Sequence, residues 1–189
     1  MPHETWADAY FTQAKQDFYL ALHGMTNISQ IECGASVCML LQMFFEKYAK
    51  AVFCAQTGQL PPKNHLAAGN FLGALKKSST KYKKWKDNPT LKLCFDFIKK
   101  IESLQPANAN KWKEIDDCPQ LEYPWCFHDV IYSPAMDLDI VSELKNAKSP
   151  ILANVIHFAK NLIDTFPLFV KTHRFSYIFF SIKDNTDDI

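Results

Sequence analysis

The sequence predicts an all-α protein, and three observations support this fold class. Apolar residues recur at intervals of three and four along much of the chain, the spacing of one helix face. Helix-start signals and Gly or Pro stop signals flank these segments. The chain has 189 residues, of which 48% are hydrophobic, enough for the core of a single globular unit.

The first predicted helix covers residues 5–23. Thr5 can cap it with Asp8 three residues further on, and Gly24 is expected to end it. Its apolar stripe is expected to contain Trp6, Tyr10, Ala14, Phe18, Ala21 and Leu22.

The second predicted helix, residues 35–57, has the strongest helical periodicity in the chain. Gly58 stops it, and Pro61 and Pro62 prevent any continuation. Its apolar residues are Val37, Leu40, Leu41, Phe44, Phe45, Tyr48, Val52 and Ala55.

Two further helices are expected before residue 105. Asn64 is the predicted cap of the third, and Asn88 followed by Pro89 starts the fourth, because Asn caps well and Pro suits the first helical position. Their apolar residues are Leu66, Phe71, Leu72 and Leu75 in the third, and Leu91, Phe95, Ile98 and Ile101 in the fourth.

The last part of the chain begins with a long connection, residues 105–134, in which periodicity fails and prolines accumulate. Helicity resumes over 137–147 and again from Pro150 to Ile163, and Pro167 is expected to close the last helix. The tail 174–183 is rich in β-branched and aromatic residues and is expected to be irregular or a short strand. We therefore divide the chain into a helical unit, 1–166, and an unassigned tail, 167–189.

Cysteine usage and the absence of an apolar span predict a cytoplasmic protein that does not enter a membrane. No stretch reaches the roughly 18 uncharged apolar residues of a membrane helix, and the amino terminus lacks an export signal. The six cysteines are widely spread, which favours buried reduced thiols over disulfides. Metal-ligand spacing and cofactor motifs are missing, so we predict neither a metal nor a cofactor.

Charge is divided into two neighbouring blocks of opposite sign. Residues 76–113 hold eleven lysines against three acidic residues, a local net charge of +8, whereas residues 114–143 hold eight acidic residues and neither Lys nor Arg. The blocks can pair within one chain or across a dimer, or the acidic block can mask a basic surface from nucleic acid. Composition does not choose among these alternatives.

Short motifs in the first two helices resemble the HEPN family, the higher-eukaryote and prokaryote nucleotide-binding helical domains. Their order is "AKQDFYLA", a turn, "Q-x-x-x-EK-x-x-KA", then Gly, prolines and "KNHL". Later, LEYPW at 121–125 is similar to a loop segment of that family. The matching residues are Ala14, Asp17, Ala21, Cys38, Gln42, Glu46, Lys47, Lys50, Ala51, Gly58, Pro62, His65 and Leu66.

The resemblance implies an up-and-down bundle of four or five helices that forms a homodimer. It also implies links to RNA cleavage, defence and toxin–antitoxin systems, the last with a partner protein encoded nearby. Active members share an R-x4-6-H motif, but the sole arginine here is Arg174 and no histidine follows it. Glu122 and His128 lie where the motif would fall, with a carboxylate in place of the cation that would hold a phosphate.

The polar residues of the second helix, Gln42, Glu46, Lys47 and Lys50, have two interpretations. We favour a solvated stripe with an intrahelical Glu46–Lys50 pair. The alternative places Lys47 and Lys50 toward a ligand or partner in a dimer cleft. His65 and His128 are likewise more typical of packed or capping histidines than of catalysts, with His128 the weak candidate for an acid or base.

The segment 76–86, KKSSTKYKKWK, interleaves lysines with two aromatic residues. Lysines can neutralise phosphates while aromatic rings stack on unpaired bases, although a solvated helix end is the more common outcome of such a run. Its candidate contacts are Lys81, Tyr82, Lys83, Lys84 and Trp85. We predict a binding or regulatory module for nucleic acid or nucleotide without ribonuclease activity. The alternatives are a ribonuclease that uses His128 and a purely structural dimerisation module.

Overall fold

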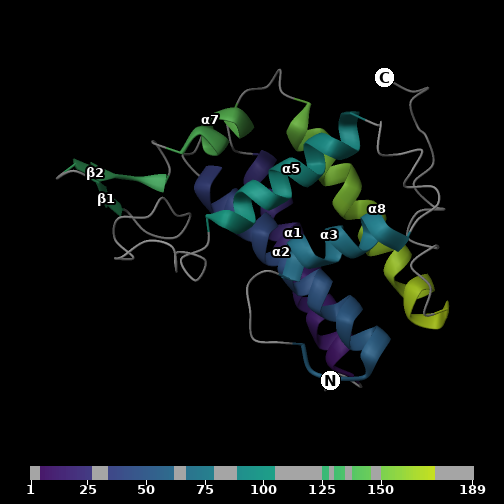
Figure 1. Cartoon of the computed structure of the whole chain (residues 1–189). Coiled ribbons are helices and arrows are strands. Elements are labelled where there is room, and N and C mark those ends of the chain that lie inside the picture. Colours follow the sequence, from purple (N-terminus) through teal and green to yellow (C-terminus); the bar gives the residue numbers. More distant parts are fainter. Residues whose placement is uncertain are drawn as a thin grey trace.

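The computed structural model describes residues 5–26, 34–61, 67–78, 89–104, 125–127, 130–134, 138–145 and 150–172. Helix dominates these ranges, which confirms the predicted helical class (Figure 1). The elements are α1 (Trp6–Thr26), α2 (Gly34–Thr57), α3 (Ala67–Ser78), α5 (Pro89–Ser103), β1 (Trp125–Phe127), β2 (Val130–Tyr132), α7 (Asp139–Lys145) and α8 (Ile151–Thr172). Within the same ranges, no helix combines the length and apolar character needed to cross a bilayer.

Helix α1 begins where the sequence predicts and ends later. The Thr5 hydroxyl donates to Asp8 Oδ2 at 2.6 Å and accepts from the Asp8 N–H at 3.1 Å, which confirms the cap. Gly24 does not end the helix, which continues to Thr26. A Cβ at Gly24 would lie 2.9 Å from Val37 Cγ2, so this glycine permits close approach of α1 and α2. Trp6, expected on the buried stripe, is 59% exposed.

Helix α2 lies antiparallel to α1 (Figure 1) and forms the centre of the core. It ends as predicted, since Gly58 has φ of 67° and donates its N–H to the Cys54 carbonyl at 2.8 Å. The Tyr48 ring, fully buried, contacts rings from α1, α3 and α8, among them Phe11, Phe71 and Phe166. Its hydroxyl donates to the Leu162 carbonyl at 3.0 Å, so one α2 side chain joins four helices.

Helices α3 and α5 pack on α2, and α8 packs on α5. Helix α5 starts at Pro89 as predicted, and all four of its expected apolar residues are buried. In α3, Phe71, Leu72 and Leu75 are buried, whereas Asn64 and Leu66 lie outside the described residues. Cys38, Cys54 and Cys94 are buried free thiols, as the sequence predicts for them.

The carboxyl-terminal elements depart most from prediction. A hairpin, in which Trp125–Phe127 pairs antiparallel with Val130–Tyr132, lies within the expected irregular connection and at the edge of the helices (Figure 1). The predicted end of the last helix at Pro167 is wrong, because α8 runs through it to Thr172. Phe166 is buried and stacks on Phe11 with ring centroids 4.0 Å apart, so packing outweighs the hydrogen bond that proline removes. The division at residue 166 stays a prediction, and the tail 174–183 lies outside the described residues.

Candidate functional site

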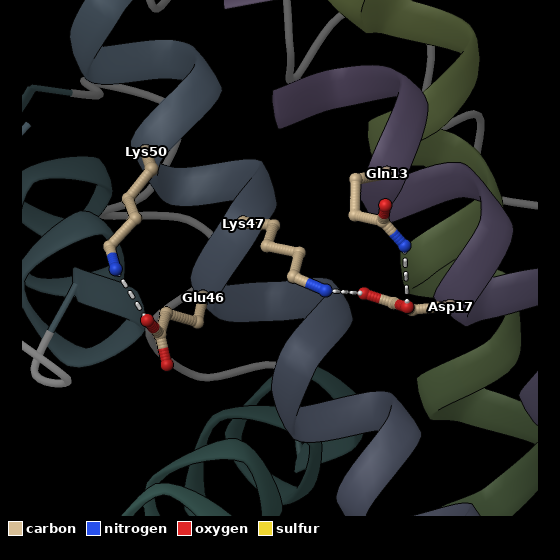
Figure 2. A network of polar contacts seen from close by, with 5 residues as sticks. All are labelled: Gln13, Asp17, Glu46, Lys47 and Lys50. Atoms are coloured by element: carbon tan, nitrogen blue, oxygen red, sulfur yellow. Dashed lines mark hydrogen bonds and ion pairs between the residues drawn. The ribbon is translucent and has the colours of Figure 1, made fainter. Parts of the chain in front are cut away.

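The polar side chains of α2 diverge to two sides of the helix, as Figure 2 shows. On one side, Lys47 Nζ contacts Asp17 Oδ2 of α1 at 2.6 Å. Gln13 Nε2 donates to the other Asp17 oxygen at 3.2 Å. Asp17 is only 3% exposed, so its charge is compensated within the helix pair. This side joins α1 to α2.

On the other side, Lys50 Nζ donates to Glu46 Oε1 at 2.5 Å, which confirms the predicted intrahelical pair (Figure 2). The solvated stripe, however, is wrong. The side chains of Lys50 and Glu46 are only 14% and 12% exposed, and Gln42 is 4% exposed. Tertiary packing is the cause, since residues of α3 and α5 lie beside Gln42, Glu46 and Lys50 on this side of α2.

A pocket of about 280 Å³ opens beside Lys50, between α2 and α3. Its surface is mainly apolar and includes two aromatic rings, those of Phe53 and Phe71, with Lys50, Gln56 and Asn70 as the polar members. Ligand pockets in proteins have this composition: apolar walls with a few polar groups that orient the ligand. The described lining residues are Ala49, Lys50, Val52, Phe53, Gln56, Pro61, Ala67, Asn70, Phe71 and Ala74.

Glu102 holds the amino-terminal end of α3 from the last turn of α5. The Gly69 N–H donates to both carboxylate oxygens at 3.0 Å, and the Ala68 N–H is also hydrogen-bonded to the carboxylate. The carboxylate therefore serves the first-turn N–H groups of α3, which have no partners within their own helix. A Cβ at Gly69 would lie 2.5 Å from Glu102 Oε2, so any other residue here would require the carboxylate to shift.

Glu102 and Glu46 line the same narrow crevice, next to the pocket. Gln42 and Glu46 of α2, Ala68 of α3 and Glu102 of α5 contribute to its walls, and it is too narrow to hold a water molecule. Burial raises the pKa of the Glu102 carboxyl, and the nearby Glu46 carboxylate raises it further. The N–H donors of Gly69 and Ala68 and the Lys99 ammonium act in the opposite direction.

The structure thus separates the two described candidates predicted from sequence. Lys50 lines the pocket, whereas Lys47 pairs with Asp17 on the opposite side of α2. The other candidates lie outside the described residues: His65, Lys81, Tyr82, Lys83, Lys84, Trp85, Glu122 and His128.

Several residues of the site were not singled out by the sequence. One feature of the sequence could have marked Glu102: it is an acidic residue on the apolar face of the amphipathic helix α5, which is buried. Phe53 and Gln56 follow Lys50 at helical spacing, so they could have been placed on its side of α2. Gly69 and Asn70 have no signal in the local sequence that marks them, since their roles depend on how α3 lies against other helices.

Comparison with known proteins identifies no relative. No protein-family model, curated protein or solved structure matches this chain.

Proposed function

We propose that this protein is a HEPN-like helical binding module that takes up a nucleotide, or one nucleotide unit of a nucleic acid strand, without cleaving it. The antiparallel α1–α2 pair, with other helices packed against it, is compatible with such a bundle. The observation that carries the proposal is the apolar pocket with Phe53 and Phe71 in its walls and Lys50 beside them.

The volume and chemistry of the pocket favour one heteroaromatic ring. A volume of about 280 Å³ is at the small end for ligand pockets, so a base fits while the sugar and phosphate remain outside. Aromatic walls suit the flat face of a base, and the Gln56 and Asn70 amides can donate to and accept from its edge. Lys50 supplies an ammonium for the phosphate.

Binding without cleavage is favoured by the described walls of the pocket. RNA cleavage without a metal requires a proton-transfer group and a cation at the phosphate. None of the described lining residues is His or Arg, and Lys50 is paired with Glu46. His65 lies in sequence between Pro61 and Ala67, both of which line the pocket, and stays a candidate contact.

The proposal is tested by calorimetry with mononucleotides and with ApA, a dinucleoside monophosphate. Ala74 lines the pocket, so Ala74→Phe fills it and is expected to abolish binding. Ala153→Phe adds the same ring at an exposed position of α8 and is expected to bind as the wild type does. Equal affinity in Ala74→Phe, or no wild-type binding at millimolar ligand, would refute the proposal.

The lysine-rich segment is tested separately with longer strands. Lys81→Glu, Lys83→Glu and Lys84→Glu together are expected to weaken binding of single-stranded RNA and its salt dependence, but not binding of a mononucleotide. RNA fragments that appear with wild type and disappear in His128→Ala would instead establish a ribonuclease. A salt-sensitive oligomer that binds no nucleotide would favour the structural dimerisation module.

A further inference from the structure

Glu102 is not among the described lining residues of the pocket, but it is bound to the helix that forms one of the pocket walls. It lies in the last turn of α5, and its carboxylate accepts the N–H groups of Ala68 and Gly69 in the first turn of α3. Any effect of Glu102 on a ligand must therefore pass through α3. The residues that α3 contributes to the pocket are Ala67, Asn70, Phe71 and Ala74.

Two kinds of contact hold α3 in place. Its middle is held by apolar packing, as between the Phe71 ring and the Tyr48 ring of α2, whose centroids are 5.5 Å apart. Apolar packing is not directional, so it tolerates small shifts of a helix along its axis. Hydrogen bonds weaken steeply away from linear geometry, so the N–H groups bound to Glu102 fix the first turn more closely. These groups have no partner within their own helix, and Glu102 supplies one.

Asn70 is the lining residue that this contact places most directly. It follows Gly69 in the chain, and the Gly69 N–H lies 3.0 Å from both carboxylate oxygens of Glu102. The other amide of the pocket, that of Gln56, belongs to α2 and does not depend on this contact. An amide that is already in position when the ligand arrives loses less freedom on binding.

We propose that Glu102 is a positioning residue for the ligand: it holds the first turn of α3 and thereby places the Asn70 amide against the edge of the base. This inference rests on the proposed function and names a residue outside the pocket on which its affinity depends. Without the carboxylate, the pocket keeps its lining residues, but Asn70 must be ordered when the ligand binds. The expected loss of affinity is about three- to tenfold, comparable with the net contribution of one hydrogen bond.

The test is calorimetry with ApA on wild type, on Glu102→Ala, and on the same substitution in the Asn70→Ala and Gln56→Ala backgrounds. Glu102→Ala alone is expected to raise the Kd of ApA by the factor given above. In the Asn70→Ala background it is expected to have little effect, because the amide that Glu102 positions is gone. In the Gln56→Ala background the full factor is expected, because α2 holds that amide.

Two further variants separate positioning from stability. Glu102→Gln keeps a side-chain oxygen that can accept from the Gly69 N–H, and it is expected to recover part of the affinity. Val155→Ala shortens a buried side chain of α8 that does not line the pocket. It is expected to destabilise the fold and to leave the Kd of ApA unchanged.

An unchanged Kd in Glu102→Ala, or the same factor in both backgrounds, would overturn the inference and leave the proposed function intact. A raised Kd in Val155→Ala would do the same, because lost stability would then account for the effect. No binding of ApA by wild type would overturn both.

Discussion

Gly69 and Gly73 occupy the same side of α3 four residues apart, yet only one of them has a close neighbour. Glu102 Oε2 lies 2.5 Å from the position that a Cβ at Gly69 would take, whereas nothing lies within 4 Å of a Cβ at Gly73. At single-residue scale, the glycine in the first turn serves a contact between helices. The other only lowers the helix propensity of α3.

Gly69→Ala is therefore expected to lower the free energy of unfolding by up to about 1 kcal/mol, since the methyl group requires the Glu102 carboxylate to shift and to weaken its hydrogen bonds to the first turn of α3. Gly73→Ala is expected to raise it by about 0.5–1 kcal/mol. Denaturant unfolding measures both. If the Gly69 penalty does not shrink in a Glu102→Ala background, the carboxylate is not its cause.

Asp17 and Lys47 form the second contact at this scale. Removing the ammonium leaves a carboxylate that is 3% exposed with only Gln13 described as a side-chain donor, so Lys47→Met is expected to cost about 2–3 kcal/mol. Lys160→Met, at an exposed position of α8, should change stability by less than about 0.5 kcal/mol. Urea titration gives the free energy of unfolding of both variants and of the double variant Asp17→Leu/Lys47→Met. The double variant should recover part of the loss.

Among the elements, α8 is the one whose extent sequence alone could not predict. Proline removes the N–H that would bind the Ile163 carbonyl and crowds the preceding turn, so a helix end at Pro167 was the natural expectation. The helix continues because Phe166 is buried against Phe11. This contact joins residues far apart in the chain, so local sequence patterns do not contain it.

Replacing Pro167 should recover the free energy that the missing helix hydrogen bond costs. Pro167→Ala is expected to raise the free energy of unfolding by up to about 3 kcal/mol, because alanine restores the helix hydrogen bond and its residue is exposed. Thermal and denaturant unfolding report the gain, with Lys160→Ala as a near-neutral substitution in the same helix. A destabilised Pro167→Ala would mean that α8 needs the proline to bend.

Helices α2 and α5 were predictable because their signals agree with each other. Periodic apolar residues, the stop at Gly58 and the start at Pro89 all point to the same boundaries. The site was predictable only in part. Lys50 could be proposed from helical spacing, but the contacts between helices that shape the site could not. These contacts join residues far apart in the chain: Glu102 and Gly69 are 33 positions apart, and Asp17 and Lys47 are 30 apart.

Across the whole molecule, buried thiols make the core sensitive to alkali. Burial raises the pKa of Cys38 and of Cys94 to about 12, from an ordinary value of 9.0. The folded state therefore keeps both protons where the unfolded chain loses them. Their contribution to stability is complete below pH 9 and is lost as pH rises from 9 toward 12.

The expected slope is about 1.4 kcal/mol of lost unfolding free energy per pH unit for each thiol. Cys38→Ala/Cys94→Ala, compared with wild type in reductant by denaturant titration at several alkaline pH values, should lose stability less steeply with pH. The comparison concerns slopes, because the cavities left by the substitutions lower stability at every pH. Parallel slopes in the two proteins would contradict the assignment.

Ionisation of Tyr48 can be used to monitor unfolding of the core. Its ring packs against α1, α3 and α8, and burial raises the pKa of its hydroxyl well above the ordinary 10.0. The ultraviolet absorbance of phenolate should therefore appear from this ring only after the helices separate. The chain has seven tyrosines, and the phenolate absorbance of Tyr48 should report global unfolding. Tyr48→Phe would remove the part of the absorbance change that accompanies unfolding.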